Sequence, residues 1–217
     1  MKNRLNLEVL DEKRKEVLNF IFSLPFGNSF YLAGGTGLAV QIGHRNSIDF
    51  DLFSSSNQLK FKDRERIKRQ LRKFDGLRVI FEEDNILDVS LTDVRISFFY
   101  YPYRLVKSFL TSGKIKVASM EDIALMKLAA IISRGSRKDF IDLYFIIREY
   151  IPLKNLFRMA KRKYPEVYDF SILALKGLTF FKDAEKEKMP LMFKKVRWKK
   201  IKDFFIQETK KIVFNPG

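Results

Sequence analysis

The sequence predicts an α+β fold: a mixed β-sheet core with flanking helices, followed by a helical C-terminal half. Two observations carry this prediction. Residues 77–101 are rich in β-branched and aromatic residues and are divided by polar pairs, as in a β-meander. From residue 119 onward the apolar residues instead recur at helical spacing. We therefore expect an α/β core over residues 1–118 and a helical domain over residues 119–217.

The elements of the first half can be placed from periodicity and breakers. A helix over residues 8–24 ends at Pro25 and Gly27. The other expected elements of the core are a strand at 29–33, a helix at 35–43, a strand at 48–53, a basic helix at 60–74, the meander and a strand at 114–118. The expected helices of the second half are 119–134, a helix from 137 to about 150 that Ser136 caps, 153–163, 170–177 and 196–212.

Composition excludes several kinds of chemistry. The 217 residues are 46% hydrophobic and 31% charged, which is typical of a globular protein with its own core. The absence of cysteine excludes disulfides and thiolate ligands, and a single histidine, His44, excludes a multi-histidine zinc site. We expect His44 in a surface loop, with contact to a base or phosphate as the alternative. No long apolar run or signal-peptide pattern is present, so we expect a cytoplasmic protein without a membrane partner.

The net charge of +16 favours an anionic partner such as nucleic acid or nucleotide phosphates. The alternative is a thermophile-like charged surface without a dedicated ligand. The charge is concentrated in residues 60–73, with eight basic and two acidic residues, and 186–211, with ten basic and three acidic. The aromatic residues interleaved in the second segment are expected to face the core more often than a nucleobase.

Two glycines stand where a short strand gives way to a helix. Gly34 and Gly35 let the backbone approach a ligand closely, and the helix N-terminus offers amide donors to a phosphate. Thr36 can donate its hydroxyl to a phosphate or cap the helix. The pair alone is weak evidence, because neither a GKS/T loop nor a GxGxxG fingerprint is present.

Two aspartates follow in the strand IDFDLF. Asp49 and Asp51 are two residues apart, so both carboxylates leave the same face, while the apolar residues that alternate with them point into the core. Carboxylate oxygens suit Mg²⁺ (or Mn²⁺), which commonly bridges to substrate phosphates. The alternative is structural: the aspartates pair with Arg45 or another basic side chain.

The order of these motifs carries a family resemblance. LAGGT followed by DFD, with Asp49 fourteen residues after Gly35, resembles the signature of the polymerase β-like nucleotidyltransferase superfamily. YLAGGTGLAVQIGHRNSIDFDLF resembles the AbiEii/AbiGii-type nucleotidyltransferase toxins in particular. A second block, EDIALMKLAAIISRGSRKDFIDLYFII, resembles that family's downstream helices, and the resemblance covers roughly residues 28–150.

The resemblance implies a nucleotidyltransferase core whose active-site cleft is covered by the helical domain. It implies site residues by their positions in the motifs. The catalytic set is Asp49, Asp51, Lys138 and Asp139, with Asp49 and Asp51 as the metal ligands, and the nucleotide-binding set is Gly34, Gly35, Thr36, Arg45, Lys127 and Asp142. Asp139 orients a lysine or serves as a base. The alternative for Asp139 and Asp142 is an ordinary i,i+3 pair on a helix surface.

One position departs from the superfamily pattern. A third carboxylate is usual on a neighbouring strand, and Ser97 stands at that place here, with Asp88 and Asp93 nearby but awkward for the role. We therefore expect one Mg²⁺ rather than two, and Asp139 in place of the missing base.

The expected function is Mg²⁺-dependent transfer of a nucleoside monophosphate from an NTP to an acceptor hydroxyl, with the 3′ end of tRNA favoured. The resemblance implies the toxin of a toxin–antitoxin or phage-defence system, with a cognate antitoxin as a possible partner. Two alternatives stay open: a catalytically weakened nucleotide- or RNA-binding module on the same fold, and a nucleotidyltransferase that modifies proteins.

Overall fold

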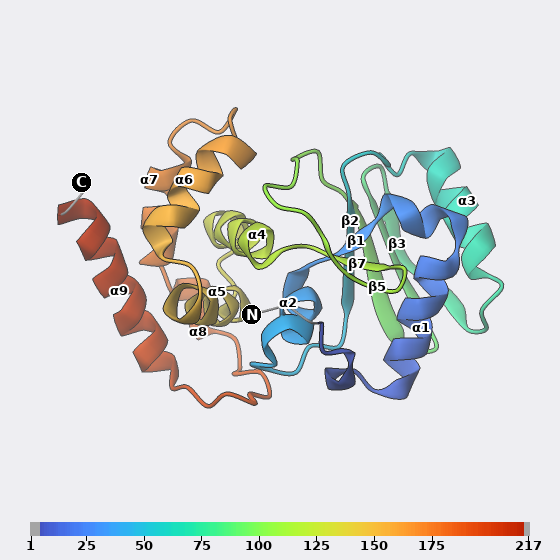
Figure 1. Ribbon diagram of the computed structural model, residues 1–217, viewed down its shortest axis with the longest axis horizontal. Helices are drawn as coiled ribbons and strands as arrows, with labels where there is room; N and C mark the ends of the chain where they lie inside the picture. Colours follow the sequence, from blue (N-terminus) through green and yellow to red (C-terminus); the bar gives the residue numbers. More distant parts are fainter. Residues whose placement is uncertain (1–4, 215–217) are drawn as a thin grey trace. The chain divides into compact units, whose positions relative to one another are not determined.

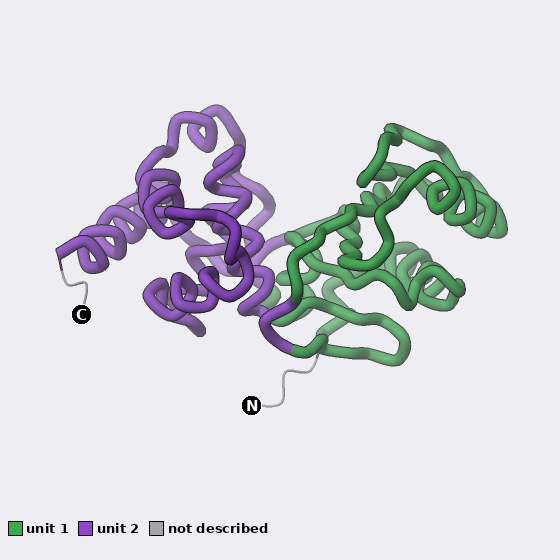
Figure 2. The backbone as a smooth tube through the Cα atoms, turned by 90° about the horizontal axis from the view of Figure 1, so that it is seen from above, with its two compact units in different colours: residues 1–43, 47–104, 108–119 green, residues 44–46, 105–107, 120–217 purple. Residues whose placement is uncertain are grey.

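The computed structural model describes residues 5–214 of the chain (Figure 1). These residues divide into two compact units (Figure 2). Unit 1 holds the described residues up to Gly43 together with 47–104 and 108–119, and unit 2 holds 44–46, 105–107 and the described residues from Met120 on. The chain therefore enters unit 2 in two short excursions before it builds the rest of that unit.

The predicted domain ranges, 1–118 and 119–217, stay a prediction. Their outer ends, residues 1–4 and 215–217, lie outside the described part of the chain.

Unit 1 contains a seven-stranded sheet within the described residues, in the order β3-β4-β5-β2-β1-β7-β6. The strands are β1 (Tyr31–Leu32), β2 (Phe50–Ser54), β3 (Leu77–Glu83), β4 (Ile86–Leu91), β5 (Val94–Tyr100), β6 (Leu110–Ser112) and β7 (Ile115–Val117). The β2–β5 and β1–β7 pairs are parallel and the others antiparallel. The predicted mixed sheet and its meander, β3 to β5, are confirmed. The sequence did not reveal β6, because this strand has only three residues and two of them are polar.

The helices of unit 1 lie close to their predicted positions. They are η1 (Leu7–Val9), α1 (Glu12–Ser23), η2 (Pro25–Ser29), α2 (Gly34–Ile42) and α3 (Phe61–Leu71). The first long helix begins at Glu12 rather than residue 8, because the Asp11 side chain accepts a hydrogen bond from the Arg14 N–H at 2.8 Å and caps α1.

The two faces of the sheet differ in chemistry. On one face, Phe50 and Leu52 of β2 lie beside their register partners in β5, Ile96 and Phe98. All four side chains are fully buried. Residues of α1 and α3 belong to the same apolar cluster. Burial of each such side chain stabilises the fold by about 2 kcal/mol. The opposite face carries the alternating polar residues, so packing of the core fixes where the polar groups point.

Unit 2 is helical, as predicted. Its helices are α4 (Met120–Ser133), α5 (Arg137–Glu149), α6 (Leu153–Lys163), α7 (Phe170–Leu178), α8 (Lys182–Glu185) and α9 (Trp198–Phe214). Ser136 caps α5 as predicted, since its Oγ accepts a hydrogen bond from the Asp139 N–H at 3.4 Å. The single turn of α8 was not predicted, because four residues are too few to show a helical period.

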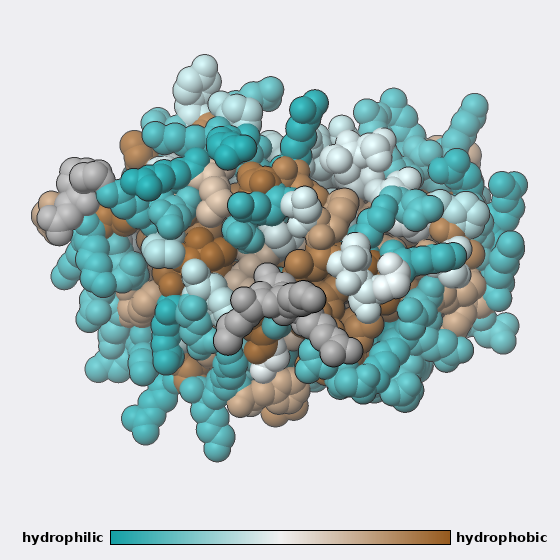
Figure 3. All heavy atoms as spheres, in the orientation of Figure 1, coloured by the Kyte–Doolittle hydropathy of each residue, from teal (hydrophilic) through white to brown (hydrophobic). Residues whose placement is uncertain are grey.

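Hydrophilic residues cover much of the face shown in Figure 3. Among the described residues we find no helix that has both the length and the apolar character required to cross a membrane.

Candidate active site

In unit 1, helix α2 begins at a glycine that lies against Asp51. Gly34 has a φ of +60°, and a Cβ built on it would stand only 2.1 Å from Asp51 Oδ2. A side chain at this position would therefore collide with the carboxylate. The first N–H groups of a helix have no acceptor within it, and they give the helix N-terminus a partial positive charge. Gly34 thus brings the start of α2 and a carboxylate to the same place.

Thr36 fixes the chain that leads into β2. Its side chain is buried, and Oγ1 donates to the main-chain oxygen of Asp49 at 2.6 Å while lying 2.9 Å from Ser47 Oγ. The hydroxyl does not cap α2, which has no side-chain cap. In the described structure it positions Asp49 instead. Its contact with a phosphate stays a prediction.

Asp49 and Asp51 flank a fully buried phenylalanine, Phe50. Asp49 is exposed and immediately precedes β2, whereas Asp51 is the second residue of the strand and half-buried. The expectation that the apolar residue at position 48 points into the core is wrong: Ile48 is 45% exposed, because β2 begins only at Phe50. The two carboxylates are therefore accessible to a ligand.

These two aspartates fit a magnesium ion by their chemistry. Mg²⁺ prefers oxygen ligands and is commonly held by one or two carboxylates together with water and substrate phosphates. The described residues contain no cluster of three or more histidine, cysteine or acidic side chains that could hold a metal ion. A magnesium ion at Asp49 and Asp51 would therefore take its remaining ligands from water or from a nucleotide.

The strand register places two further polar residues beside Asp51. Ser97 of β5 is the register partner of Asp51, where the superfamily pattern has its third carboxylate. Asp88 of β4 is in turn the register partner of Ser97. Partners on adjacent strands share a face of the sheet, so Asp51, Ser97 and Asp88 form one row across three strands.

Arg95 joins this row through Asp88. Its Nε lies 3.1 and 3.0 Å from the two carboxylate oxygens of Asp88, and its Nη2 donates to Oδ2. Ser97 Oγ donates to Oδ1 at 3.1 Å. The hydrogen bonds that Arg95 donates to Asp88, and then the charges of Asp88, Asp49 and Asp51, raise the pKa of Arg95. No role for Arg95 was predicted, although its alternation with Ser97 along β5 is visible in the sequence.

In unit 2, Asp142 is the centre of a buried ionic cluster. Its carboxylate accepts hydrogen bonds from Arg45 Nε at 2.6 Å and Arg45 Nη2 at 2.8 Å. Lys127 Nζ lies 2.7 Å from Oδ2 and His44 Nε2 lies 2.7 Å from Oδ1. Asp142 is therefore not an exposed helix residue. Arg45 thus has Asp142 as a partner. The structural alternative, in which Asp49 and Asp51 pair with Arg45 or another basic side chain, stays a prediction.

Asp139, one turn earlier on α5, shares Lys127 with Asp142. Lys127 Nζ donates to Asp139 Oδ1 at 2.9 Å, and Arg134 Nε and Ser136 Oγ lie 2.9 and 2.8 Å from Oδ2. The surface i,i+3 pair considered for Asp139 and Asp142 is therefore wrong, because a lysine bridges the two carboxylates inside the unit.

The cluster holds its groups in their charged forms. Burial would raise the pKa of Asp139, but Lys127 and Arg134 outweigh it and lower that pKa to about 2. The pKa of Asp142 is likewise held well below its usual value, against burial, by Lys127 and Arg45. Burial would lower the pKa of Lys127, yet the two aspartates raise it. A carboxylate of such low pKa is a poor base, so the geometry favours the orienting role for Asp139.

His44 is fully buried, so the expectation of a surface-loop histidine is wrong. Residues 44–46 belong to unit 2, and backbone bonds hold them: the N–H groups of Phe193 and Lys194 donate to the His44 oxygen at 3.0 and 2.9 Å. Burial lowers the pKa of His44 in spite of its bond to Asp142, so the imidazole is held neutral. Its Nδ1 has no hydrogen-bond partner among the described residues.

The predicted site residues thus fall into two groups, one in each unit. Gly34, Gly35, Thr36, Asp49 and Asp51 belong to unit 1, and Arg45, Lys127, Lys138, Asp139 and Asp142 belong to unit 2. Lys138 differs from its neighbours because it is exposed and has no ion pair within the described residues. Among the predicted site residues of unit 2, it is the cation available to an incoming anion.

Comparison with solved structures identifies the fold. The fold is that of the nucleotidyltransferases: a solved structure of a nucleotidyltransferase from Helicobacter pylori matches with a TM-score of 0.54, at 18% identity over 94% of this chain and 98% of that one. MenT4, a nucleotidyltransferase toxin of Mycobacterium tuberculosis, matches with a TM-score of 0.49, at 15% identity over 90% of this chain and 81% of that one.

The sequence places the chain in one family within this class. The family model for the nucleotidyl transferase AbiEii toxin of type IV toxin–antitoxin systems matches residues 19–215. The chain belongs to this AbiEii family, as the motifs predicted, and is a nucleotidyltransferase. An uncharacterized protein of Aquifex aeolicus is 36% identical over 211 residues, which cover 95% of this chain and 98% of that protein.

Proposed function

We propose that this protein is a Mg²⁺-dependent nucleotidyltransferase toxin that moves a nucleoside monophosphate from an NTP to an acceptor hydroxyl on RNA, with the 3′ end of tRNA favoured. The observation that carries the proposal is the contact of Gly34 with Asp51. This contact brings the N-terminus of α2 to the accessible carboxylate pair. The carboxylates can hold a metal ion, and the helix N-terminus can bind the phosphates of a nucleotide.

Each group of residues has a part in this reaction. Asp49 and Asp51 would hold the magnesium ion, which when bound would supply Lewis-acid stabilisation of the charge on the transferred phosphate. Gly34, Gly35 and Thr36 bind phosphate oxygens through the start of α2. Lys138 neutralises further charge on the triphosphate.

The buried cluster of unit 2 acts by positioning. Lys127 forms ion pairs with both Asp139 and Asp142, and Arg45 donates a further hydrogen bond to Asp142. They hold the first turn of α5 in place, and with it the exposed Lys138 that precedes Asp139. Their nucleotide-binding role is therefore exerted through the helix that they fix.

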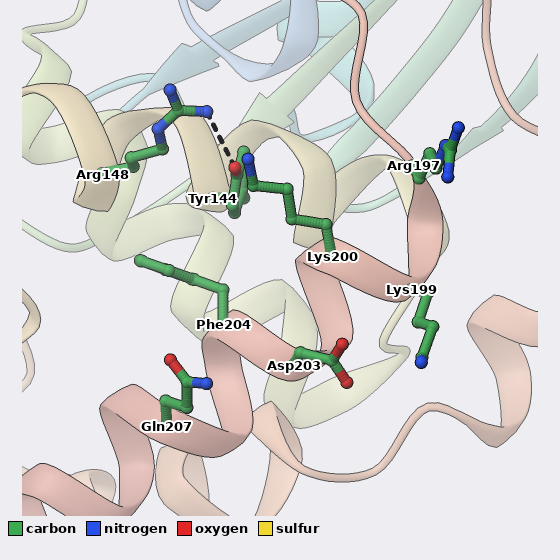
Figure 4. Close-up of a pocket in the computed structure, with 8 residues that line it drawn as sticks. All are labelled: Tyr144, Arg148, Arg197, Lys199, Lys200, Asp203, Phe204 and Gln207. Carbon is green, nitrogen blue, oxygen red and sulfur yellow. Dashed lines mark hydrogen bonds between the residues drawn. The ribbon is translucent and has the colours of Figure 1, made fainter.

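An RNA acceptor is supported by a basic groove between α5 and α9. The groove has a volume of about 620 Å³. It is lined by Tyr144, Arg148, Arg197, Lys199, Lys200, Asp203, Phe204 and Gln207 (Figure 4). Figure 4 shows Lys200 extending toward Tyr144, whose hydroxyl accepts a hydrogen bond from Arg148 at 2.9 Å. Four cations thus line one open concavity that has a single carboxylate.

These four cations differ from several other basic residues of unit 2. Carboxylates neutralise Lys186, Lys194, Lys202 and Lys211 at 2.6 to 2.8 Å. Arg148, Arg197, Lys199 and Lys200 have no such partner within residues 5–214. Uncompensated cations beside aromatic rings are typical of surfaces that bind a nucleic-acid backbone. An antitoxin is the further partner that membership of a type IV toxin–antitoxin family suggests.

The proposal is tested by nucleotide transfer. With Mg²⁺, a labelled NTP and total tRNA, the protein is expected to label RNA, and each of the four NTPs is tried in turn. Asp49→Asn and Asp51→Asn are expected to reduce labelling by about a thousandfold, since each removes a metal ligand. Their far-UV circular dichroism serves as the folding control. Labelling that continues undiminished in both variants would contradict the metal role. Labelling of protein instead of RNA would show that the acceptor is a protein.

A further inference from the structure

The polar face of the sheet lacks one carboxylate and holds an arginine beside the gap. Ser97 occupies the place across from Asp51, and its hydroxyl is committed to Asp88. Adjacent strands lie about 4.8 Å apart, so Asp88, two strands from Asp51, is about 10 Å away along the row. Both carboxylate oxygens of Asp88 also accept hydrogen bonds from Arg95, and Oδ1 accepts one from Ser97, so Asp88 is engaged within the protein.

Arg95 lies between these two carboxylates on the same face. It stands two residues before Ser97 on β5, and residues two apart on a strand point to the same side. Continuing the parallel β2–β5 register by one step pairs Arg95 with Asp49. The charges of both Asp49 and Asp51 act on its guanidinium. Arg95 is thus a neighbour of the candidate metal ligands.

The guanidinium is anchored but accessible. Asp88 is almost fully buried and accepts hydrogen bonds from Nε and Nη2 of Arg95, while the Arg95 side chain remains 56% exposed. Its Nη1 has no acceptor among the described residues. A planar guanidinium that is held on one edge can present its remaining N–H groups to a phosphate in a fixed direction.

We propose that Arg95, positioned by Asp88, binds the phosphate groups of the NTP at the Asp49–Asp51 site and takes the place of a second metal ion. This inference rests on the proposed function. It explains why Ser97 needs no carboxylate: the cation that a third carboxylate would recruit is supplied by the protein itself. Asp88 is then a positioning residue, because it acts on the nucleotide only through Arg95.

The test measures NTP binding, with a non-hydrolysable NTP and Mn²⁺, so that catalysis is not required. Arg95→Gln is expected to weaken NTP affinity by about tenfold or more, since charge-assisted hydrogen bonds to phosphate are lost. Asp88→Asn is expected to weaken it by a smaller factor, because the guanidinium remains but loses its anchor. Arg95→Lys is expected to restore only part of the affinity, since lysine lacks the fork geometry.

A matched pair on the same sheet provides the control. Arg78 of β3 is exposed, belongs to the same unit and pairs with Asp93 in the turn between β4 and β5. Arg78→Gln and Asp93→Asn remove the same charges at the sheet edge and are expected to leave NTP affinity within about twofold. Equal losses from both arginine variants would reduce the effect to net charge and overturn the inference.

Metal stoichiometry supplies a second readout. Electron paramagnetic resonance of Mn²⁺ is expected to show one ion per bound NTP in the wild type. Ser97→Asp is expected to raise this number toward two if the variant remains folded by circular dichroism. Two ions per nucleotide in the wild type would overturn the inference and leave the proposed function standing. If neither NTP nor Mn²⁺ binds the wild type, the proposed function itself fails.

Discussion

Arg45 and Asp142, ninety-seven residues apart in the sequence, form a buried two-point ion pair. The bonds from Nε and Nη2 measure 2.6 and 2.8 Å, and the two side chains are 3% and 0% exposed. Such a pair gives little net stability relative to apolar residues, but removal of one partner leaves a buried charge without its counter-charge. The pair therefore fixes where residues 44–46 attach to α5, and its loss has a high cost.

Asp142→Asn is expected to lower the free energy of unfolding by about 3 kcal/mol or more. The variant leaves Arg45 and Lys127 sharing fewer negative charges inside unit 2, because Asp142 contacts both. Urea unfolding followed by circular dichroism measures the difference.

Asp183→Asn is the control for this experiment. Asp183 pairs with Lys186 at 2.8 Å on the surface, where both side chains are more than half exposed. Exposed pairs contribute about 0–1 kcal/mol. If the two variants lost equal stability, the buried cluster would not have the role that its geometry indicates.

The pH dependence of stability is expected to follow Asp139. Its pKa is about 2 in the folded chain and 3.8 ordinarily, so the unfolded state binds the proton first as the pH falls. The carboxylate therefore stabilises the fold above pH 4 by about 2 kcal/mol, and this contribution is lost between pH 4 and pH 2. Urea unfolding of the wild type and Asp139→Asn checks this: the stability gap should be full at pH 5 and should shrink below pH 4. A gap that does not change with pH would contradict the assignment.

Local sequence patterns were sufficient for much of the fold and for half of the site. The alternation along IDFDLF predicted that Asp49 and Asp51 share a face, and the Gly34–Gly35 pair predicted a close approach of the backbone. Both follow from rules that act within a few residues. The β-meander and the helical C-terminal half are predictable for the same reason, since their periods are local.

The features that the sequence did not predict depend on contacts between residues that are distant in the sequence. His44 was expected in a surface loop and Arg45 at the nucleotide, because nothing near them in sequence reveals Asp142 as their partner. Asp88 and Ser97 became neighbours only when the β4–β5 register was known. A shift of that register by one residue would move both side chains to the other face. Spacing along one strand cannot decide this.

Gly34→Ala is expected to abolish binding of Mn²⁺ and NTP while the chain remains folded. The new Cβ would stand 2.1 Å from Asp51 Oδ2, so the carboxylate must leave its position. The positive φ of +60° adds about 1 kcal/mol of backbone strain. Mn²⁺ binding by electron paramagnetic resonance measures the effect on the site.

Gly43→Ala separates backbone strain from the collision. Gly43 ends α2 with a φ of +55°, and nothing lies within 4 Å of a Cβ built there. This variant is expected to lose about 1 kcal/mol of stability and to keep its metal affinity. Equal loss of Mn²⁺ binding in both variants would show that strain in α2, and not the contact with Asp51, controls the site.

Removal of the groove cations is expected to weaken RNA binding and to flatten its salt dependence. The variant Arg197→Gln, Lys199→Gln, Lys200→Gln changes three groups that line the groove on or beside α9. Each lost phosphate contact reduces the slope of log K against log salt by about 0.7 to 0.9. Fluorescence anisotropy with labelled tRNA at several salt concentrations measures both affinity and slope, and it requires no NTP.

A second triple variant makes the comparison independent of net charge. Lys62, Arg66 and Arg69 are exposed on α3 and have no ion pair within the described residues. Their replacement by glutamine removes the same three charges from the other basic helix, outside the groove. We expect this variant to bind tRNA nearly as well as the wild type, because α3 lines no part of the groove. If both triple variants lost the same affinity, the attraction would be a property of the whole +16 charge. If only an acidic protein partner lost affinity for the groove variant, the groove would be a protein interface.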